Sequence, residues 1–219
     1  MGLLAKETFI CIDCESTGLD TNNDRIIEIA ICKFTFDQVI DSYETLVDPK
    51  REIPEESILI HHITQDMVEG KPQIQDILKN VLDMKERYTI VGHGIAFDIN
   101  LITQEAKRHG IKSHFERNQV IDTLRLARLY GKSPTNSLAM LREHFNIPDH
   151  GAHRAMSDVL VNIEVFKYLS SSYNTTQSLM KRLERPIQLM NMPLGKHKGR
   201  PFKEVPIDYL NWAKHQNFD

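Results

Sequence analysis

The sequence has few cysteines and no hydrophobic run long enough to cross a membrane. Only Cys11, Cys14 and Cys32 occur in the 219 residues. This sparse, odd number argues against a disulfide framework and suits a reducing compartment, so we expect a cytoplasmic protein. No run of about 18 apolar residues is present, and the first residues lack the basic start of a signal peptide. We therefore expect no contact with a membrane.

The sequence also lacks an excess of charge of one sign. It holds 27 lysines and arginines against 30 aspartates and glutamates, for a formal net charge of −3. Because nucleic-acid-binding proteins are often basic overall, composition alone does not indicate one. A hydrophobic content of 41% is ordinary for a globular protein.

Alternating apolar residues predict three strands joined by short turns, as in an antiparallel meander. Two later strands alternate with helical patterns, which predicts an α/β fold: a mixed five-stranded sheet flanked by helices. The expected strands cover residues 8–14, 25–34, 39–47, 88–93 and 119–123. The expected helices cover residues 72–82, 96–108, 124–130, 138–145 and 152–169.

A polar stretch near residue 171 ends the main domain. We expect a domain over residues 7–170, a linker over 171–191 with a short helix at 177–184, and a small C-terminal module over 192–219. The module is too short to fold robustly alone. We expect it to dock on the main domain or on a second copy of the chain.

The first predicted strand ends in two acids, Asp13 and Glu15. Side chains two residues apart on a strand point to the same face, so the two carboxylates should lie side by side. Two like charges so close repel each other, and a divalent metal ion is one way to neutralise them. Taken alone, a strand that ends in polar residues at a turn explains the pair better.

A further acid follows a later strand. Asp98 comes after a glycine-rich turn and falls in the first turn of the next expected helix. An acid at this position also suits the helix dipole, which is the ordinary explanation. Asp122 ends another strand, where the role of helix N-cap explains it better, and we leave it out of the site.

His153 and Asp158 lie near the start of the last long helix. If both were helical, they would be separated by about 140° around the axis and could not easily reach one metal centre. If His153 precedes the helix, the freedom of Gly151 lets it fold back beside Asp158. The motif alone more often marks a surface helix start.

The acids and the histidine occur in the order typical of one family. Asp13 and Glu15, then Asp98, then His153 and Asp158 resemble the DEDDh exonucleases. Within that family, the surrounding motifs are most similar to the proofreading epsilon subunits of bacterial DNA polymerase III. The resemblance covers most of the main domain and implies a ribonuclease H-like fold.

The resemblance implies a hydrolytic site with two Mg²⁺ or Mn²⁺ ions, which prefer oxygen ligands. Asp13 would bind both ions. Glu15 and Asp158 would hold the ion that carries the attacking water, and Asp98 would act through the water shell of the other. His153 would be the general base, for which an ordinary pKa near about 6.5 is suitable.

The resemblance also implies a pocket for a frayed 3′ end. Its residues are Thr17, Gly18, Leu19, His61 and Phe97. Backbone amides of the first three could bind the 3′-hydroxyl, and Leu19 could wedge beneath the terminal base, since stacking tolerates any base. Leu19 and Phe97 could equally be core residues, and His61 an ordinary loop residue.

The C-terminal module carries a basic cluster: Lys196, Lys198, Arg200 and Lys203. Contact with nucleic-acid phosphates is one interpretation, and a solvated basic turn is the other. The module resembles one appended to some bacterial exonucleases, and it departs from the extension by which epsilon subunits dock on the polymerase.

These observations predict a two-metal 3′→5′ exonuclease that releases nucleoside 5′-monophosphates from single-stranded or frayed DNA ends, in proofreading or repair. An RNA-trimming enzyme of the same superfamily is one alternative. An inactive nuclease fold that serves as a nucleic-acid-binding scaffold is the other. The expected partners are DNA 3′ ends or RNA, and a DNA polymerase subunit.

Overall fold

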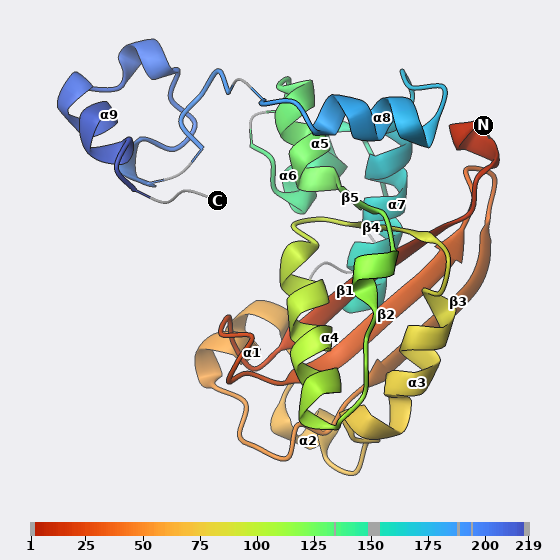
Figure 1. Cartoon of the computed structure of the whole chain (residues 1–219). Helices are drawn as coiled ribbons and strands as arrows, with labels where there is room; N and C mark the ends of the chain where they lie inside the picture. The colour runs from red at the N-terminus through yellow and green to blue at the C-terminus, as the bar shows by residue number, and fades with distance from the viewer. Residues whose placement is uncertain (1–2, 134, 149–153, 188, 194, 217–219) are drawn as a thin grey trace.

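The computed structural model describes residues 3–133, 135–148, 154–187, 189–193 and 195–216. At its centre is a five-stranded sheet in the order β3-β2-β1-β4-β5 (Figure 1). The strands are β1 (Phe9–Ser16), β2 (Ile26–Phe34), β3 (Val39–Leu46), β4 (Thr89–Gly92) and β5 (Val120–Asp122). β1, which carries the first two acids, is therefore the middle strand.

β1 joins two kinds of strand pairing. It runs antiparallel to β2, with Cys11 opposite Cys32, and parallel to β4, with Cys11 opposite Val91. β2 and β3 are antiparallel, whereas β4 and β5 are parallel. The predicted meander, followed by strands that alternate with helices, is thereby confirmed, as is the mixed sheet.

Helices cover both faces of the sheet. One face is covered by α5, α6 and α7, and the other by α3 and α4. The cysteines are buried and free as expected, with Cys11 in the core beneath α7 and Cys14 in the core beneath α4. The helices are α1 (Glu55–His61), α2 (Gln65–Val68), α3 (Ile74–Met84), α4 (Ala96–Arg108), α5 (Thr123–Tyr130), α6 (Leu138–His144), α7 (Ala155–Ser170), α8 (Thr176–Leu183) and α9 (Ile207–Ala213).

The helix α1 was not predicted from the sequence. It follows Pro54, and its apolar residues Leu59 and Ile60 are 71% and 62% exposed. Because these side chains do not face the core, the segment lacks the apolar periodicity by which helices are recognised. The segment nevertheless forms a short helix, and its Ser57 donates a hydrogen bond to the Thr17 carbonyl just after β1.

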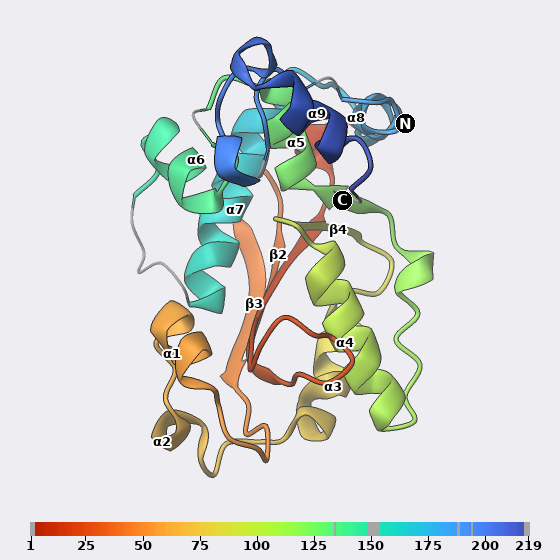
Figure 2. The same ribbon diagram turned by 90° about the vertical axis from the view of Figure 1, so that its left-hand side faces the viewer.

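The chain leaves the main domain through α8. Thr175 caps this helix, and Leu179 and Leu183 join the core beneath α7. The C-terminal module then forms a separate small cluster around Met192, Val205 and Ala213. Figures 1 and 2 show the module projecting beyond the main domain.

Within the described ranges, none of the helices has the length and apolar character needed to cross a membrane.

Candidate active site

Three acids from two elements meet at the end of β1. Asp13 and Glu15 lie on β1, and Asp158 lies in the first turn of α7. One carboxylate oxygen from each residue lies within 4.8 Å of the others. The sheet thus brings together acids that are more than 140 positions apart in the sequence.

The charges of this acidic cluster disfavour its fully ionised form. Burial, followed by repulsion from Asp98 and Glu15, raises the pKa of Asp13 well above its usual range. Burial and the nearby Asp158 raise the pKa of Glu15 to about 8. Carboxylate oxygens at this spacing fit a hard divalent cation such as Mg²⁺ or Mn²⁺, which would relieve the repulsion.

Asp98 borders the cluster from the other face of the sheet. It lies in the first turn of α4, and its Oδ1 accepts a hydrogen bond of 2.9 Å from the Cys14 amide, between the two acids of β1. Burial raises the pKa of Asp98 to about 7, although the bond from Cys14 opposes this shift. Asp98 is thereby fixed to β1 but is not one of the three clustered acids.

A buried acid on β2, Glu28, holds the start of α7 in place. Its carboxylate accepts hydrogen bonds of 3.0 and 3.1 Å from Arg154 Nε, and one of 2.9 Å from the Ala155 amide. Glu28 faces Glu15 in the register of β1 and β2. The contact therefore sets the position of Asp158, one turn further along α7.

Sequence reasoning did not identify Glu28 as part of the site. One signal was present, because a charge in the middle of the apolar run from Ile26 to Ile31 needs a partner when it is buried. The predicted general base, His153, lies outside the described residues, and its role stays a prediction.

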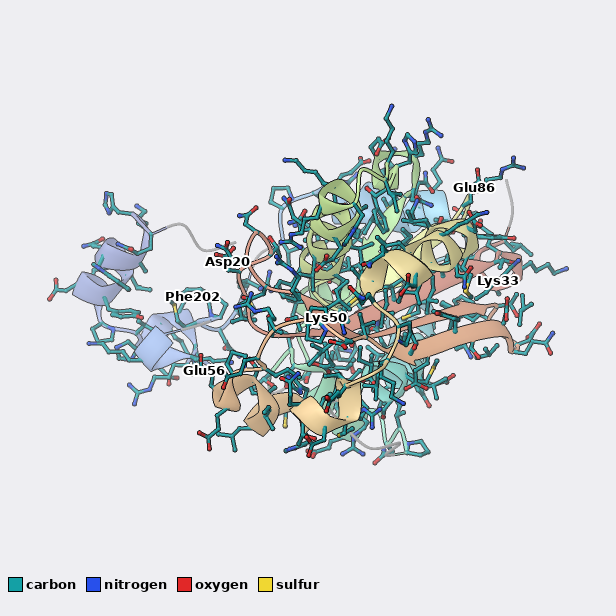
Figure 3. The ribbon with its side chains drawn as sticks, turned by 90° about the horizontal axis from the view of Figure 1, so that it is seen from below. Asp20, Lys33, Lys50, Glu56, Glu86 and Phe202 are labelled. Carbon is teal, nitrogen blue, oxygen red and sulfur yellow. The ribbon has the colours of Figure 1, made fainter. Side chains whose placement is uncertain are left out.

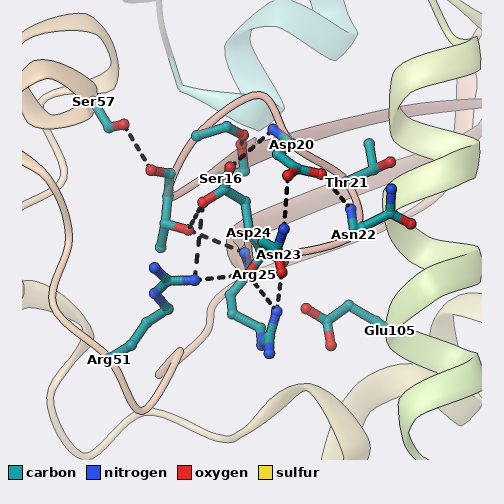
Figure 4. A network of polar contacts seen from close by, with 12 residues as sticks. Ser16, Asp20, Thr21, Asn22, Asn23, Asp24, Arg25, Arg51, Ser57 and Glu105 are labelled. Carbon is teal, nitrogen blue, oxygen red and sulfur yellow. Dashed lines mark hydrogen bonds and ion pairs between the residues drawn. The ribbon is translucent and has the colours of Figure 1, made fainter.

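The loop after β1 is held by its own hydrogen bonds (Figure 4). The Thr17 amide donates to the Arg25 carbonyl, and its hydroxyl donates to Asp24. Ser57 of α1 donates to the Thr17 carbonyl over 2.9 Å. Because the Thr17 amide is engaged, a substrate would find the amides of Gly18 and Leu19 rather than that of Thr17.

Gly18 sits where a side chain would not fit. A Cβ atom there would lie 2.5 Å from Asp24 Oδ2. The loop therefore depends on glycine for its close approach to Asp24. Leu19 next to it is 87% exposed, so the alternative that it is a core residue is excluded.

His61 and Phe97 enter the site region from α1 and α4. His61 is buried, and its Nδ1 accepts from the Ile63 amide, which leaves the proton on Nε2. That Nε2 faces the backbone of Ser16 without reaching hydrogen-bond geometry, and burial lowers the pKa of the ring. Phe97 is partly buried and packs against the core beneath α4.

Asp122 has the structural role predicted for it. Its Oδ1 accepts 2.8 and 2.9 Å hydrogen bonds from the Leu124 and Gly94 amides. It thereby caps α5 and fixes the turn that leads to α4. Its predicted role as a helix N-cap is confirmed.

The comparisons with known proteins agree with this geometry. Residues 10–166 match the family described as "Exonuclease" (RNase_T). The chain belongs to this exonuclease family. The predicted resemblance to DEDDh exonucleases is thus confirmed, and so is the ribonuclease H-like fold.

Two relatives show how much of the exonuclease is shared. This chain is 32% identical over 160 residues to the DNA polymerase III subunit epsilon of Aquifex aeolicus. The matched stretch makes up 73% of this chain and 78% of that subunit. The chain is 33% identical over 163 residues to the PolC-type DNA polymerase III of Clostridium perfringens, or 74% of this chain. The chain spans only 11–12% of the PolC-type polymerases.

The fold of the exonuclease is also found in a solved structure. Exonuclease I of E. coli, in complex with a dT13 oligonucleotide, superposes with a TM-score of 0.70 at 20% identity, covering 81% of this chain and 43% of that one. Residues 180–219 match a second family, described as "Putative quorum-sensing-regulated virulence factor". The C-terminal module therefore has relatives of its own.

Proposed function

We propose that the protein is a metal-dependent 3′→5′ exonuclease that removes nucleoside 5′-monophosphates from single-stranded or frayed DNA ends. The observation that supports this most directly is the meeting of Asp13, Glu15 and Asp158 within 4.8 Å. Such a cluster can hold the divalent cations that serve phosphodiester hydrolysis. A trimming enzyme for RNA is the alternative substrate class.

The acids would act as the holders of two divalent cations. Asp13, Glu15 and Asp158 would supply oxygen ligands directly, and Asp98 would act from its place against β1. The ions would supply Lewis-acid stabilisation of the charge that develops on the phosphate oxygens. The fit rests on the donor set, because only oxygen atoms face one another in this cluster.

The protein's own groups would bind and orient the substrate. Leu19 is exposed beside the site and would pack against the terminal base, while the Gly18 and Leu19 amides would face the 3′-hydroxyl. His61 and Phe97 would line the same pocket. His153 would accept the proton of the attacking water, a role worth on the order of 10²–10⁴ in rate.

The test is hydrolysis of labelled single-stranded DNA and RNA in Mg²⁺ or Mn²⁺. We expect nucleoside 5′-monophosphates from the 3′ end of DNA. Asp158→Asn should reduce the rate on the order of 10²-fold or more, as expected for loss of one preorganised electrostatic group. Faster trimming of RNA than DNA would instead favour the alternative substrate class.

The matched control is Asp122→Asn. Asparagine caps helices about as well as aspartate, so this variant should keep both fold and activity. Release of no mononucleotide from either substrate by the unmodified protein would overturn the exonuclease proposal and leave the inactive scaffold. Full activity of Asp158→Asn would overturn the assignment of the site.

We place this activity in the cytoplasm, in proofreading or repair. The three free, buried thiols suit a reducing compartment. A polymerase partner is suggested by the names of the relatives DNA polymerase III subunit epsilon and PolC. Size-exclusion chromatography of the protein mixed with a purified replicative polymerase subunit tests this association.

A further inference from the structure

The C-terminal module concentrates positive charge on a chain that is acidic overall. Its described part, within residues 192–216, holds five lysines and arginines and two acids, although the whole chain has a formal net charge of −3. All five cations are exposed and make no ion pair with any described residue: Lys196, Lys198, Arg200, Lys203 and Lys214. Such charges are available to an anionic partner.

The module lies at the same end of the molecule as the loop after β1. In Figure 3, Phe202 of the module, Asp20 of the loop and Glu56 of α1 lie toward one end, and Lys33 and Glu86 toward the other. In Figure 1, α9 and α1 both lie on the left-hand side, with α9 near the top and α1 near the bottom. The module therefore projects on the side of the molecule where the acids of β1 are found.

Aromatic rings lie among these cations, with Trp212 exposed and Tyr209 half-buried. Trp212 is 51% exposed, and its ring centroid lies 5.1 Å from that of Tyr209. His197 packs edge-on against Tyr209 at 4.6 Å, and Lys196 lies over the Tyr209 ring at 5.2 Å. Exposed aromatic faces flanked by cations are the combination by which proteins bind unpaired bases without sequence preference.

A cavity lies between the main domain and the chain that leads into the module. It has a volume of about 470 Å³, and Lys198 of the module and Met190 of the linker line it together with Arg128 of α5. His93, which follows β4, also lines it. The cavity is therefore bordered by a basic side chain of the main domain, Arg128, and by one of the module, Lys198.

We propose that Trp212 and Tyr209 form a stacking platform for an unpaired base of the nucleic acid, on the 5′ side of the end being cut. The exposed cations and Arg128 would contact the phosphates between platform and site. The inference rests on the proposed function, because it concerns how the same substrate is held. It commits to single-stranded nucleic acid, with DNA and RNA as separate arms of the test.

The positive charge around this platform would offset the negative charge of the site when a strand binds. The acids of the site repel phosphates unless cations are bound, so the site alone would hold a long strand weakly. A cationic, aromatic surface away from the acids compensates for this repulsion. Long strands that reach the platform should therefore bind more tightly than short ones that do not.

The single tryptophan of the chain permits a direct test. Because Trp212 is the only tryptophan, its fluorescence reports on the platform without interference. In the Asp158→Asn background, in which hydrolysis is slowed, we expect a thymidine oligonucleotide of about 20 residues to quench this fluorescence. The quenching should follow the same binding curve as the anisotropy of a dye on the oligonucleotide.

Substitution separates the platform from the rest of the module. Trp212→Ala should weaken binding of the long oligonucleotide about 5- to 100-fold, because one stacked base is lost. Trp212→Phe should keep most of the wild-type affinity, because its ring can still stack on a base. Tyr168→Ala, a ring 52% exposed on α7, and Lys181→Ala on α8 are the matched controls and should leave binding unchanged.

The outcomes distinguish this inference from its rivals. Binding of the oligonucleotide without a change in Trp212 fluorescence would overturn it. So would an altered sedimentation coefficient of Trp212→Ala without nucleic acid, which would identify the surface as a contact between copies of the chain. Quenching by oligonucleotides that the wild-type enzyme fails to hydrolyse would uphold the platform and overturn the proposed exonuclease. A greater loss with the RNA oligonucleotide than with DNA would support the platform and name RNA as its ligand.

Discussion

Among single residues, Glu28 shows how a buried charge can serve a site that it does not enter. Its carboxylate is fully buried and binds Arg154 and the Ala155 amide, both at the start of α7. A buried carboxylate destabilises the folded state unless its charge is paired and its oxygens are hydrogen-bonded. Glu28 is therefore a positioning residue for Asp158 rather than a catalytic one.

Replacing Glu28 should weaken the response to metal. We expect Glu28→Gln to raise the Mg²⁺ concentration for half-maximal hydrolysis about 10- to 100-fold, as found when a group that orients a metal ligand is lost. The measurement is the initial rate against Mg²⁺ concentration. Glu44→Gln, an exposed acid on neighbouring β3, should behave like wild type. An unchanged Mg²⁺ dependence for Glu28→Gln would show that Asp158 needs no such support.

Residues of this kind mark the limit of prediction from the sequence. The closeness of Asp13 and Glu15 was predictable because strand periodicity alone places them on one face. The role of Glu28 was not, since its partner Arg154 lies 126 residues away and no local pattern joins the two. The exposure of Leu19 likewise depends on the path of the whole loop after β1.

At the scale of elements, the site is a junction of β1, α4 and α7. Each of these elements contributes at least one acid. That the three elements meet follows from the predicted fold class, and no single element shows it. Strong periodicity made the sheet and α3, α4, α5 and α7 predictable. The helix α1 escaped prediction because Leu59 and Ile60 face away from the core.

This junction should make the stability of the metal-free protein depend on pH. The folded state raises the pKa of Glu15 to about 8 and that of Asp98 to about 7, above their values in an unfolded chain. Folded protein then binds more protons than unfolded protein, so stability is greatest below the unfolded values and falls as pH rises through the folded ones. In EDTA we expect Tm to fall between about pH 5 and about pH 8.

Added Mg²⁺ should reverse this fall. A cation that binds only the folded protein raises Tm, and its effect should grow with pH as the acids ionise. Scanning calorimetry with and without Mg²⁺ measures both trends. Asp13→Asn serves as the comparison, because removal of one charge should flatten the pH dependence in EDTA. A Tm that rises with pH in EDTA would contradict the assigned shifts.

At the scale of the whole molecule, Arg125 of α5 holds the linker that leads to the C-terminal module. Its guanidinium donates to the Leu183 carbonyl over 2.9 and 2.6 Å and to the Arg185 carbonyl over 3.3 Å. These bonds close the end of α8 and direct the chain toward the module. The sequence predicted that the module docks, but such contacts between distant segments have no local signature.

Arg125→Ala should therefore loosen the module. We expect faster cleavage by trypsin near Arg185 and weaker binding of long oligonucleotides, because the platform would no longer be held beside the site. Limited proteolysis followed by mass spectrometry measures the first effect, and fluorescence anisotropy measures the second. Lys181→Ala, which removes an exposed charge from α8, is the control. Equal cleavage of the two variants would mean that other contacts fix the module.

The ion pair between Glu28 and Arg154 also has a consequence for how the protein is made. Synthesis runs from the N-terminus, so β1, β2 and α4, with Asp13, Glu15 and Asp98, emerge first. Asp158 and the arginine that seats its helix emerge only after more than two thirds of the chain is complete. A nascent or prematurely terminated chain therefore carries most of the acids but not the assembled cluster, and it should be harmless to nucleic acid until the ribosome has passed α7.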